Sequence, residues 1–107
     1  MLLLTLPNPE RMKILNIWFN GYFTNPKVSY NETRTFHYLK NFEFKVYQTN
    51  YNNPNSIYDL YVSAKYLIIF IQEKGNDDKL VNSALTTLDK IVNYLSNYIQ
   101  SNFKVTL

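Results

Sequence analysis

The hydrophobic pattern is clearest in the last third of the chain. Over residues 77–100 apolar side chains recur at spacings of three and four, and the positions between them are mostly polar. This is the period of an amphipathic α-helix. Asn76, Asp77 and Asp78 supply a cap and a negative first turn, both of which favour a helix start. The sequence therefore predicts a long C-terminal helix at about 77–100.

Two segments before this helix are predicted to be strands. In residues 36–46 the even positions are apolar except for Lys40, which is the period of a half-buried strand. Residues 57–72 alternate loosely and then become continuously apolar in the run YLIIFI, residues 66–71. A continuous run of this kind predicts a strand with apolar side chains on both faces of a sheet.

Residues 9–20 have two interpretations. As a helix, the segment is capped by Asn8, has Pro9 at its first position and Glu10 in its first turn. As a strand, its residues from Ile14 to Asn20 alternate after a turn at the prolines. The start signals favour the helix, and both alternatives remain open at this point.

The expected fold is a single α+β domain over residues 1–107. An antiparallel sheet, including a short strand at 1–6, carries the C-terminal helix on one face. The polar segments 24–34 and 49–56 are predicted loops.

The second face of this sheet also needs a cover. A helix at 9–20 would supply one, whereas a strand there would leave the face bare and would require another chain. We therefore expect a homo-oligomer or a heteromeric complex. The candidate interface consists of Leu67, Ile69, Ile71, Trp18 and Phe19.

Composition limits the classes of protein. The net charge is +3, and the lysines are scattered rather than clustered, so a nucleic-acid surface is not favoured. The chain has no cysteine, which excludes disulfides and thiolate metal sites and fits a reducing compartment. The run at 66–71 is far shorter than the ~20 residues of a membrane span. We expect a cytoplasmic protein without membrane insertion.

No residues suggest catalysis, a cofactor or a metal. The single histidine, His37, has no second histidine or cysteine to work with. Asp77 and Asp78 are explained by helix capping. Asp59 interrupts an apolar segment, and we expect it to face solvent. The sequence therefore predicts a protein that is not an enzyme.

Four aromatic residues in the predicted strand over 36–47 suggest an alternative function. They could stack on the bases of single-stranded nucleic acid, as in a small nucleic-acid-associated or viral accessory protein. Packing against the helix is the simpler interpretation, because an apolar face has to be buried. The four are Phe36, Tyr38, Phe42 and Phe44.

Three segments resemble a known family. FEFKVY (42–47), KYLIIFIQEKGND (65–77) and LTTLDKIVNYLSNYI (85–99) are similar to the longin-type small (sigma and zeta) subunits of vesicle-coat adaptor complexes. The resemblance implies a strand rather than a helix at 11–19. It also implies a non-enzymatic subunit that acts through protein–protein contacts.

Overall fold

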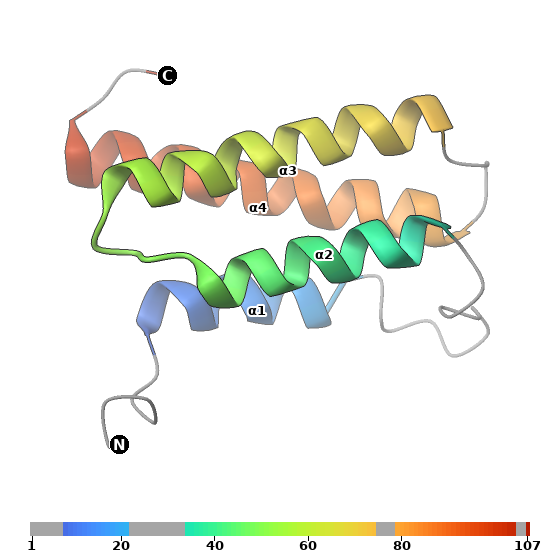
Figure 1. Cartoon of the computed structure of the whole chain (residues 1–107), viewed down its shortest axis with the longest axis horizontal. Coiled ribbons are helices and arrows are strands. Elements are labelled where there is room, and N and C mark those ends of the chain that lie inside the picture. Colours follow the sequence, from blue (N-terminus) through green and yellow to red (C-terminus); the bar gives the residue numbers. More distant parts are fainter. Residues whose placement is uncertain (1–7, 22–33, 75–78, 105–106) are drawn as a thin grey trace.

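The structure is a computed structural model, and it describes residues 8–21, 34–74, 79–104 and 107. Within these ranges the chain forms four α-helices and no strand. They are α1 (Pro9–Phe19), α2 (Arg34–Gln48), α3 (Pro54–Lys74) and α4 (Lys79–Phe103). In the bundle α3 and α4 lie side by side, α1 packs on α4, and α2 contacts both α1 and α3 (Figure 1).

The predicted α+β fold is wrong over the described ranges. Residues 36–46 and 57–72, both predicted to be strands, lie in α2 and α3. The predicted helix at 77–100 corresponds to α4, which ends at Phe103. For residues 9–20 the helix interpretation is the one observed, and the strand implied by the family resemblance is not.

Several sequence predictions fall outside the described residues. These are the strand at 1–6, most of the loop at 24–34, and the capping residues Asn76, Asp77 and Asp78. The second predicted loop is shorter than expected. It covers only residues 49–53, because α3 begins at Pro54.

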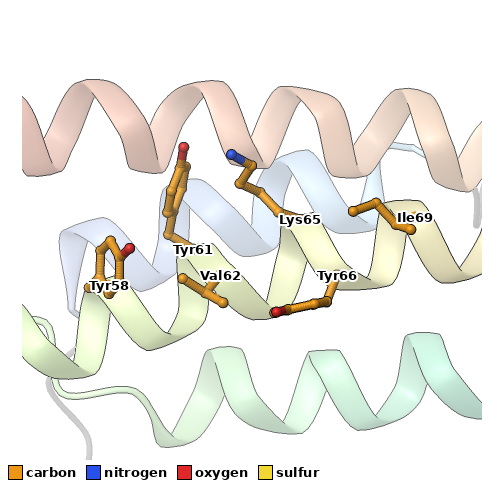
Figure 2. A pocket seen from close by; sticks show the side chains of 6 residues that line it. All are labelled: Tyr58, Tyr61, Val62, Lys65, Tyr66 and Ile69. Carbon is orange, nitrogen blue, oxygen red and sulfur yellow. The ribbon is translucent and has the colours of Figure 1, made fainter. Parts of the chain in front are cut away.

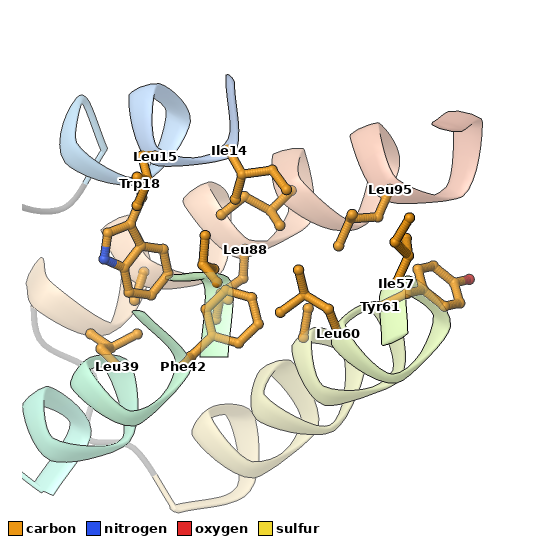
Figure 3. Close-up of a cluster of buried hydrophobic side chains, with 14 of the residues drawn as sticks. Ile14, Leu15, Trp18, Leu39, Phe42, Ile57, Leu60, Tyr61, Leu88 and Leu95 are labelled. Carbon is orange, nitrogen blue, oxygen red and sulfur yellow. The ribbon is translucent and has the colours of Figure 1, made fainter. Parts of the chain in front are cut away.

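Side chains from all four helices form one core. Trp18 is fully buried, and its ring lies 5.2 Å from that of Phe42, measured between centroids. Figure 3 shows this pair beside Leu39 of α2. The buried residues of each helix recur at three- and four-residue spacing, so each helix contributes one face. In α3 these are Ile57, Leu60, Tyr61, Ala64 and Ile71.

Local signals explain two of the helix starts. The Asn8 side chain accepts a hydrogen bond of 2.9 Å from the Arg11 backbone N–H, which caps α1. The Asn53 side chain caps α3 in the same way, because it accepts a hydrogen bond of 2.9 Å from the Asn55 backbone N–H. Proline occupies the first position of both helices, where a missing N–H costs nothing.

The C-terminal end of α1 lies close to α4. A Cβ placed on Gly21 would overlap the Thr87 side chain, which is itself buried. The Thr87 hydroxyl donates a hydrogen bond of 2.8 Å to the Ser83 carbonyl. Glycine therefore permits the close approach of these two helices.

The loop between α2 and α3 is held at the other end of α1. Arg11 donates from Nη2 to the Thr49 carbonyl at 3.3 Å, and its guanidinium carbon lies 5.5 Å from the centre of the Tyr51 ring. The Tyr51 hydroxyl donates to the Val46 carbonyl at 2.8 Å. The Tyr98 hydroxyl donates to the Tyr51 carbonyl at 3.4 Å, which adds α4 to the network. These contacts fix the turn from α2 into α3.

Candidate functional site

A stripe of mainly apolar side chains runs along the outward face of α3. Three of its members are well exposed: Tyr66 by 67%, Tyr58 by 49% and Ile69 by 48%. The residues lie three or four positions apart, so they share one side of the helix. They line a shallow hollow of about 270 Å³ (Figure 2). The α3 stripe consists of Tyr58, Val62, Lys65, Tyr66 and Ile69, and the buried Tyr61 borders it on the side of the core.

The stripe exists because α3 is apolar on more than its inner face. Its inner residues meet the core, and the outer tyrosines and Ile69 face away from it. A helix that is apolar nearly all round is usually buried. Here the outer side has no cover from the other described helices. Exposed apolar surface arranged in a line is typical of an interaction site.

The two edges of the stripe differ. Figure 2 shows Tyr61 and Lys65 pointing toward α4, and Val62 and Tyr66 toward α2. The Lys65 ammonium lies 5.2 Å from the centre of the Tyr61 ring. A cation at this distance from an aromatic face is attracted to it. Lys65 therefore has a defined position on the α4 edge.

Asp59 lies on the α2 edge. Its Oδ2 atom is 2.7 Å from Nζ of Lys45 on α2. The Asp59 side chain remains 64% exposed, so it can accept further hydrogen bonds. The α2 edge thus carries the exposed Asp59 carboxylate, paired with Lys45, and the α4 edge carries the Lys65 ammonium.

A second aromatic contact extends the apolar surface toward the C-terminal end of α3. Tyr38 of α2 lies against Phe70, with 4.3 Å between the ring centroids. Tyr38 is 39% exposed. The pair joins α2 to α3 beyond Tyr66.

The stripe carries groups that are suited to binding. It offers phenols, one ammonium group and aliphatic carbon, with no nucleophile beside a base. No group of three His, Asp or Glu side chains in the described ranges is placed to hold a metal ion. Across those same ranges, no helix has both the length and the apolar content needed to cross a membrane.

The candidate interface predicted from the sequence is dispersed by the helical fold. Trp18 and Ile71 are buried in the core, and Leu67 is half-buried against it. Ile69 and Phe19 are exposed, on different helices. The grouping assumed that alternate residues share a face, as in a strand. A helix turns about 100° per residue, so Ile69 points away from Leu67 and Ile71.

The predicted aromatic strand is also corrected. It lies in α2, where Phe42 is buried in the core while Tyr38 and Phe44 are exposed. These aromatic rings therefore do not share one face. The side chain of Phe36 is outside the described residues.

His37 and Asp59, which the sequence analysis considered as candidate functional residues, both lie on the surface. His37 is exposed on α2. Asp59 faces solvent, as expected, and its carboxylate pairs with Lys45.

Of the residues that form the stripe, the strand interpretation identified only Ile69. Tyr58, Val62 and Tyr66 are each four residues apart, and Ile69 follows three residues later. This spacing is visible in the sequence and defines a helix face. It becomes informative only once α3 is taken as a helix.

Comparison of the chain with protein-family models, curated proteins and solved structures finds no significant match. The segments that resemble longin-type subunits at 42–47 and 65–74 are helical, whereas the resemblance implies strands there. The candidate site therefore rests on its own geometry.

Proposed function

We propose that this protein is a non-enzymatic binding module that docks an amphipathic helix of a protein partner on the α3 stripe. The observation that carries the proposal is the line of exposed Tyr58, Tyr66 and Ile69 around Val62. Tyrosine is enriched at protein interfaces, because it offers a large contact area and a polar tip. The identity of the partner and the cytoplasmic location remain predictions.

The charges at the two edges define the chemistry of the partner. A docked helix would place its own apolar residues, spaced by three and four, over Val62 and Ile69. A basic or hydroxyl side chain would meet Asp59, and an acidic or aromatic one would meet Lys65. This pattern of flanking groups would fix the position of the partner along the stripe.

The charge distribution supports a protein partner over a nucleic acid. On α2, Lys40 lies 3.2 Å from Glu43 and Lys45 lies 2.7 Å from Asp59. The neighbouring carboxylates offset these cations. A phosphate backbone binds instead to a surface with a net positive stripe.

Capture of partners from the native host, followed by calorimetry with the purified partner, tests the proposal. The stripe variant is Tyr58→Ser with Tyr66→Ser. The control is Phe44→Ser, which removes an equally exposed aromatic ring from α2. We expect the stripe variant to bind at least about tenfold more weakly, as is usual for loss of interface tyrosines. The control should bind like the wild type, and hydrogen exchange of the complex should show protection at residues 58–69.

Two outcomes would contradict the proposal. One is equal partner affinity in the stripe variant and the wild type. The other is binding of short oligonucleotides at low salt that Phe44→Ser abolishes. That second result would favour the nucleic-acid alternative.

A further inference from the structure

We infer that the helix received by the α3 stripe is α3 of a second copy of this chain. The two helices run antiparallel, and a two-fold axis passes beside Val62. The inference rests on the proposed function and names the partner. It follows from the order of charged and aromatic groups along the two edges of the stripe.

On each edge α3 carries a charged residue and a tyrosine that are seven positions apart. Asp59 and Tyr66 lie on the α2 edge, and Tyr58 and Lys65 lie on the α4 edge. Residues seven apart are separated by two helical turns and stay on the same side of a helix. Along the chain Val62 lies midway between Tyr58 and Tyr66.

A two-fold axis at Val62 brings each edge against its own reversed copy. Tyr58 and Tyr66 are both four residues from Val62, and Asp59 and Lys65 are both three residues from it. Along the α2 edge, Tyr66 of the second copy therefore falls beside Asp59, where its hydroxyl can donate to the carboxylate. Along the α4 edge, Tyr58 of the second copy falls beside Lys65, where its ring can face the ammonium group.

The symmetry makes both contacts occur twice, as in any isologous dimer. The apolar centre of the stripe is buried at the same time. An antiparallel pair also places the opposite dipole ends of the two helices together. A parallel pair would instead set Lys65 beside Tyr66 of the second copy, and Asp59 beside Tyr58.

The length of the stripe sets the strength of this dimer. From Tyr58 to Ile69 the helix rises about 17 Å. A single helix pair of that length buries less than the roughly 1,200–2,000 Å² of a stable interface. The dimer should therefore be weak and reversible, with dissociation on the micromolar scale.

Opposite charges introduced at Tyr66 test the arrangement. Tyr66 is 67% exposed, so both substitutions leave the core untouched, which circular dichroism would verify. Sedimentation velocity over a concentration series measures the dissociation constant. Tyr66→Asp should weaken the dimer at least tenfold, because it places a carboxylate beside Asp59 of the other copy. Tyr66→Lys should tighten it several-fold.

Two sedimentation results would overturn the inference. In a parallel dimer residue 66 would lie beside Lys65 of the other copy. Tyr66→Asp would then tighten the dimer and Tyr66→Lys would weaken it. A wild-type chain that stays monomeric up to its solubility limit would exclude the dimer altogether.

Cysteine crosslinking tests the same geometry without changing charge. The chain has no cysteine, so an introduced thiol is unique. Asn55 and Ile69 are both seven residues from Val62, on opposite sides along the chain. Mixed Asn55→Cys and Ile69→Cys proteins should crosslink to each other, and Val62→Cys to itself. Efficient crosslinking of Ile69→Cys with itself would indicate a parallel pair and contradict the inference.

Failure of this inference is distinguishable from failure of the proposed function. If the wild type is monomeric but Tyr66→Asp abolishes capture of a host protein, the second copy is the wrong partner and the stripe remains a docking site. If Tyr66→Asp alters neither self-association nor host-protein binding, both proposals fail.

Discussion

The indole nitrogen Nε1 of Trp18 donates a hydrogen bond of 3.0 Å to Oε1 of Glu43. Trp18 belongs to α1 and is fully buried, and Glu43 belongs to α2. The second carboxylate oxygen, Oε2, lies 3.2 Å from the Lys40 ammonium. The indole nitrogen is the one polar atom of the tryptophan side chain, so this bond lets Trp18 enter the core without an unpaired donor.

Replacing Glu43 should therefore destabilise the fold. Glu43→Ala leaves the buried indole N–H without its acceptor and should lower the free energy of unfolding by about 1–3 kcal/mol. Glu43→Gln retains an acceptor and should cost less. Urea unfolding followed by circular dichroism measures both. Equal losses in the two variants would indicate that the hydrogen bond is not the cause.

The substitution Gly21→Ala should change the stability in the opposite direction to an unhindered Gly→Ala substitution. At a position without steric conflict, Gly→Ala stabilises a protein by about 0.4–1 kcal/mol. Here the new methyl group would overlap Thr87, which is 2% exposed and cannot move into solvent. We expect Gly21→Ala to destabilise the fold by about 1–3 kcal/mol. Adding Thr87→Ala should recover part of this loss in thermal unfolding, whereas no recovery would mean that the strain lies elsewhere.

Stability should decline in alkali because of buried tyrosines. Burial raises the pKa of Tyr51 well above 10, although the nearby Arg11 acts in the opposite direction. Burial also raises the pKa of Tyr94 and Tyr98. Above pH 10 the unfolded chain loses phenolic protons that the folded chain retains, so the unfolded state becomes favoured. These phenols should not affect the free energy of unfolding below about pH 9. Above pH 10 Tyr51 should lower it by up to ~1.4 kcal/mol per pH unit, and the partly exposed Tyr94 and Tyr98 should lower it by less.

Tyr51→Phe separates the contribution of that phenol. It loses the hydrogen bond to the Val46 carbonyl and should be less stable than the wild type at pH 7. It should also lose less stability between pH 8 and pH 11, since one shifted group is absent. Urea unfolding at both values measures this difference. An identical alkaline decline in both proteins would show that Tyr51 is not the source.

Leu88 and Val92 of α4 provide a test of core packing. The helical spacing of apolar residues over 77–100 predicts that both are deeply buried. Leu88 is fully buried, but Val92 is only half-buried at the edge of the core. Leu88→Ala should cost ~2–5 kcal/mol, and Val92→Ala clearly less. If Leu88→Ala lowered the free energy of unfolding by under about 1 kcal/mol, α4 would not be packed as described.

The helix α4 could be predicted because its hydrophobic pattern fits only a helix. The pattern of α2 fits both a helix and a strand. In α2 the buried residues Leu39, Phe42 and Val46 follow the helical period. The exposed rings of Tyr38 and Phe44 occupy even positions, as do Phe42 and Val46, and together these residues produce an apparent period of two. Counting every aromatic residue as apolar therefore hides the helix, because tyrosine and phenylalanine here lie on both sides of it.

The same ambiguity affects α3, where apolar residues occupy both faces. The run at 66–71 fits a strand buried on two sides as well as it fits a helix with a wide apolar arc. Length separates the two, because no glycine or proline interrupts the chain between Pro54 and Gly75. An uninterrupted segment of 21 residues is typical of a helix and exceeds most strands. The hydrogen bond between Trp18 and Glu43, by contrast, depends on how α1 packs against α2. No local sequence pattern predicts it.

The packing of α1 against α4 has a consequence for the order in which the protein folds and opens. The contacts of α2 with α3, and of α3 with α4, join neighbours along the chain and close short loops. Docking α1 onto α4 joins the two ends of the sequence and carries the largest loop-closure entropy. With 11 residues, α1 is also the shortest of the four described helices. It should therefore dock last and detach first, so the fluorescence of the single tryptophan, Trp18, reports release of α1 before circular dichroism reports loss of the α3–α4 pair.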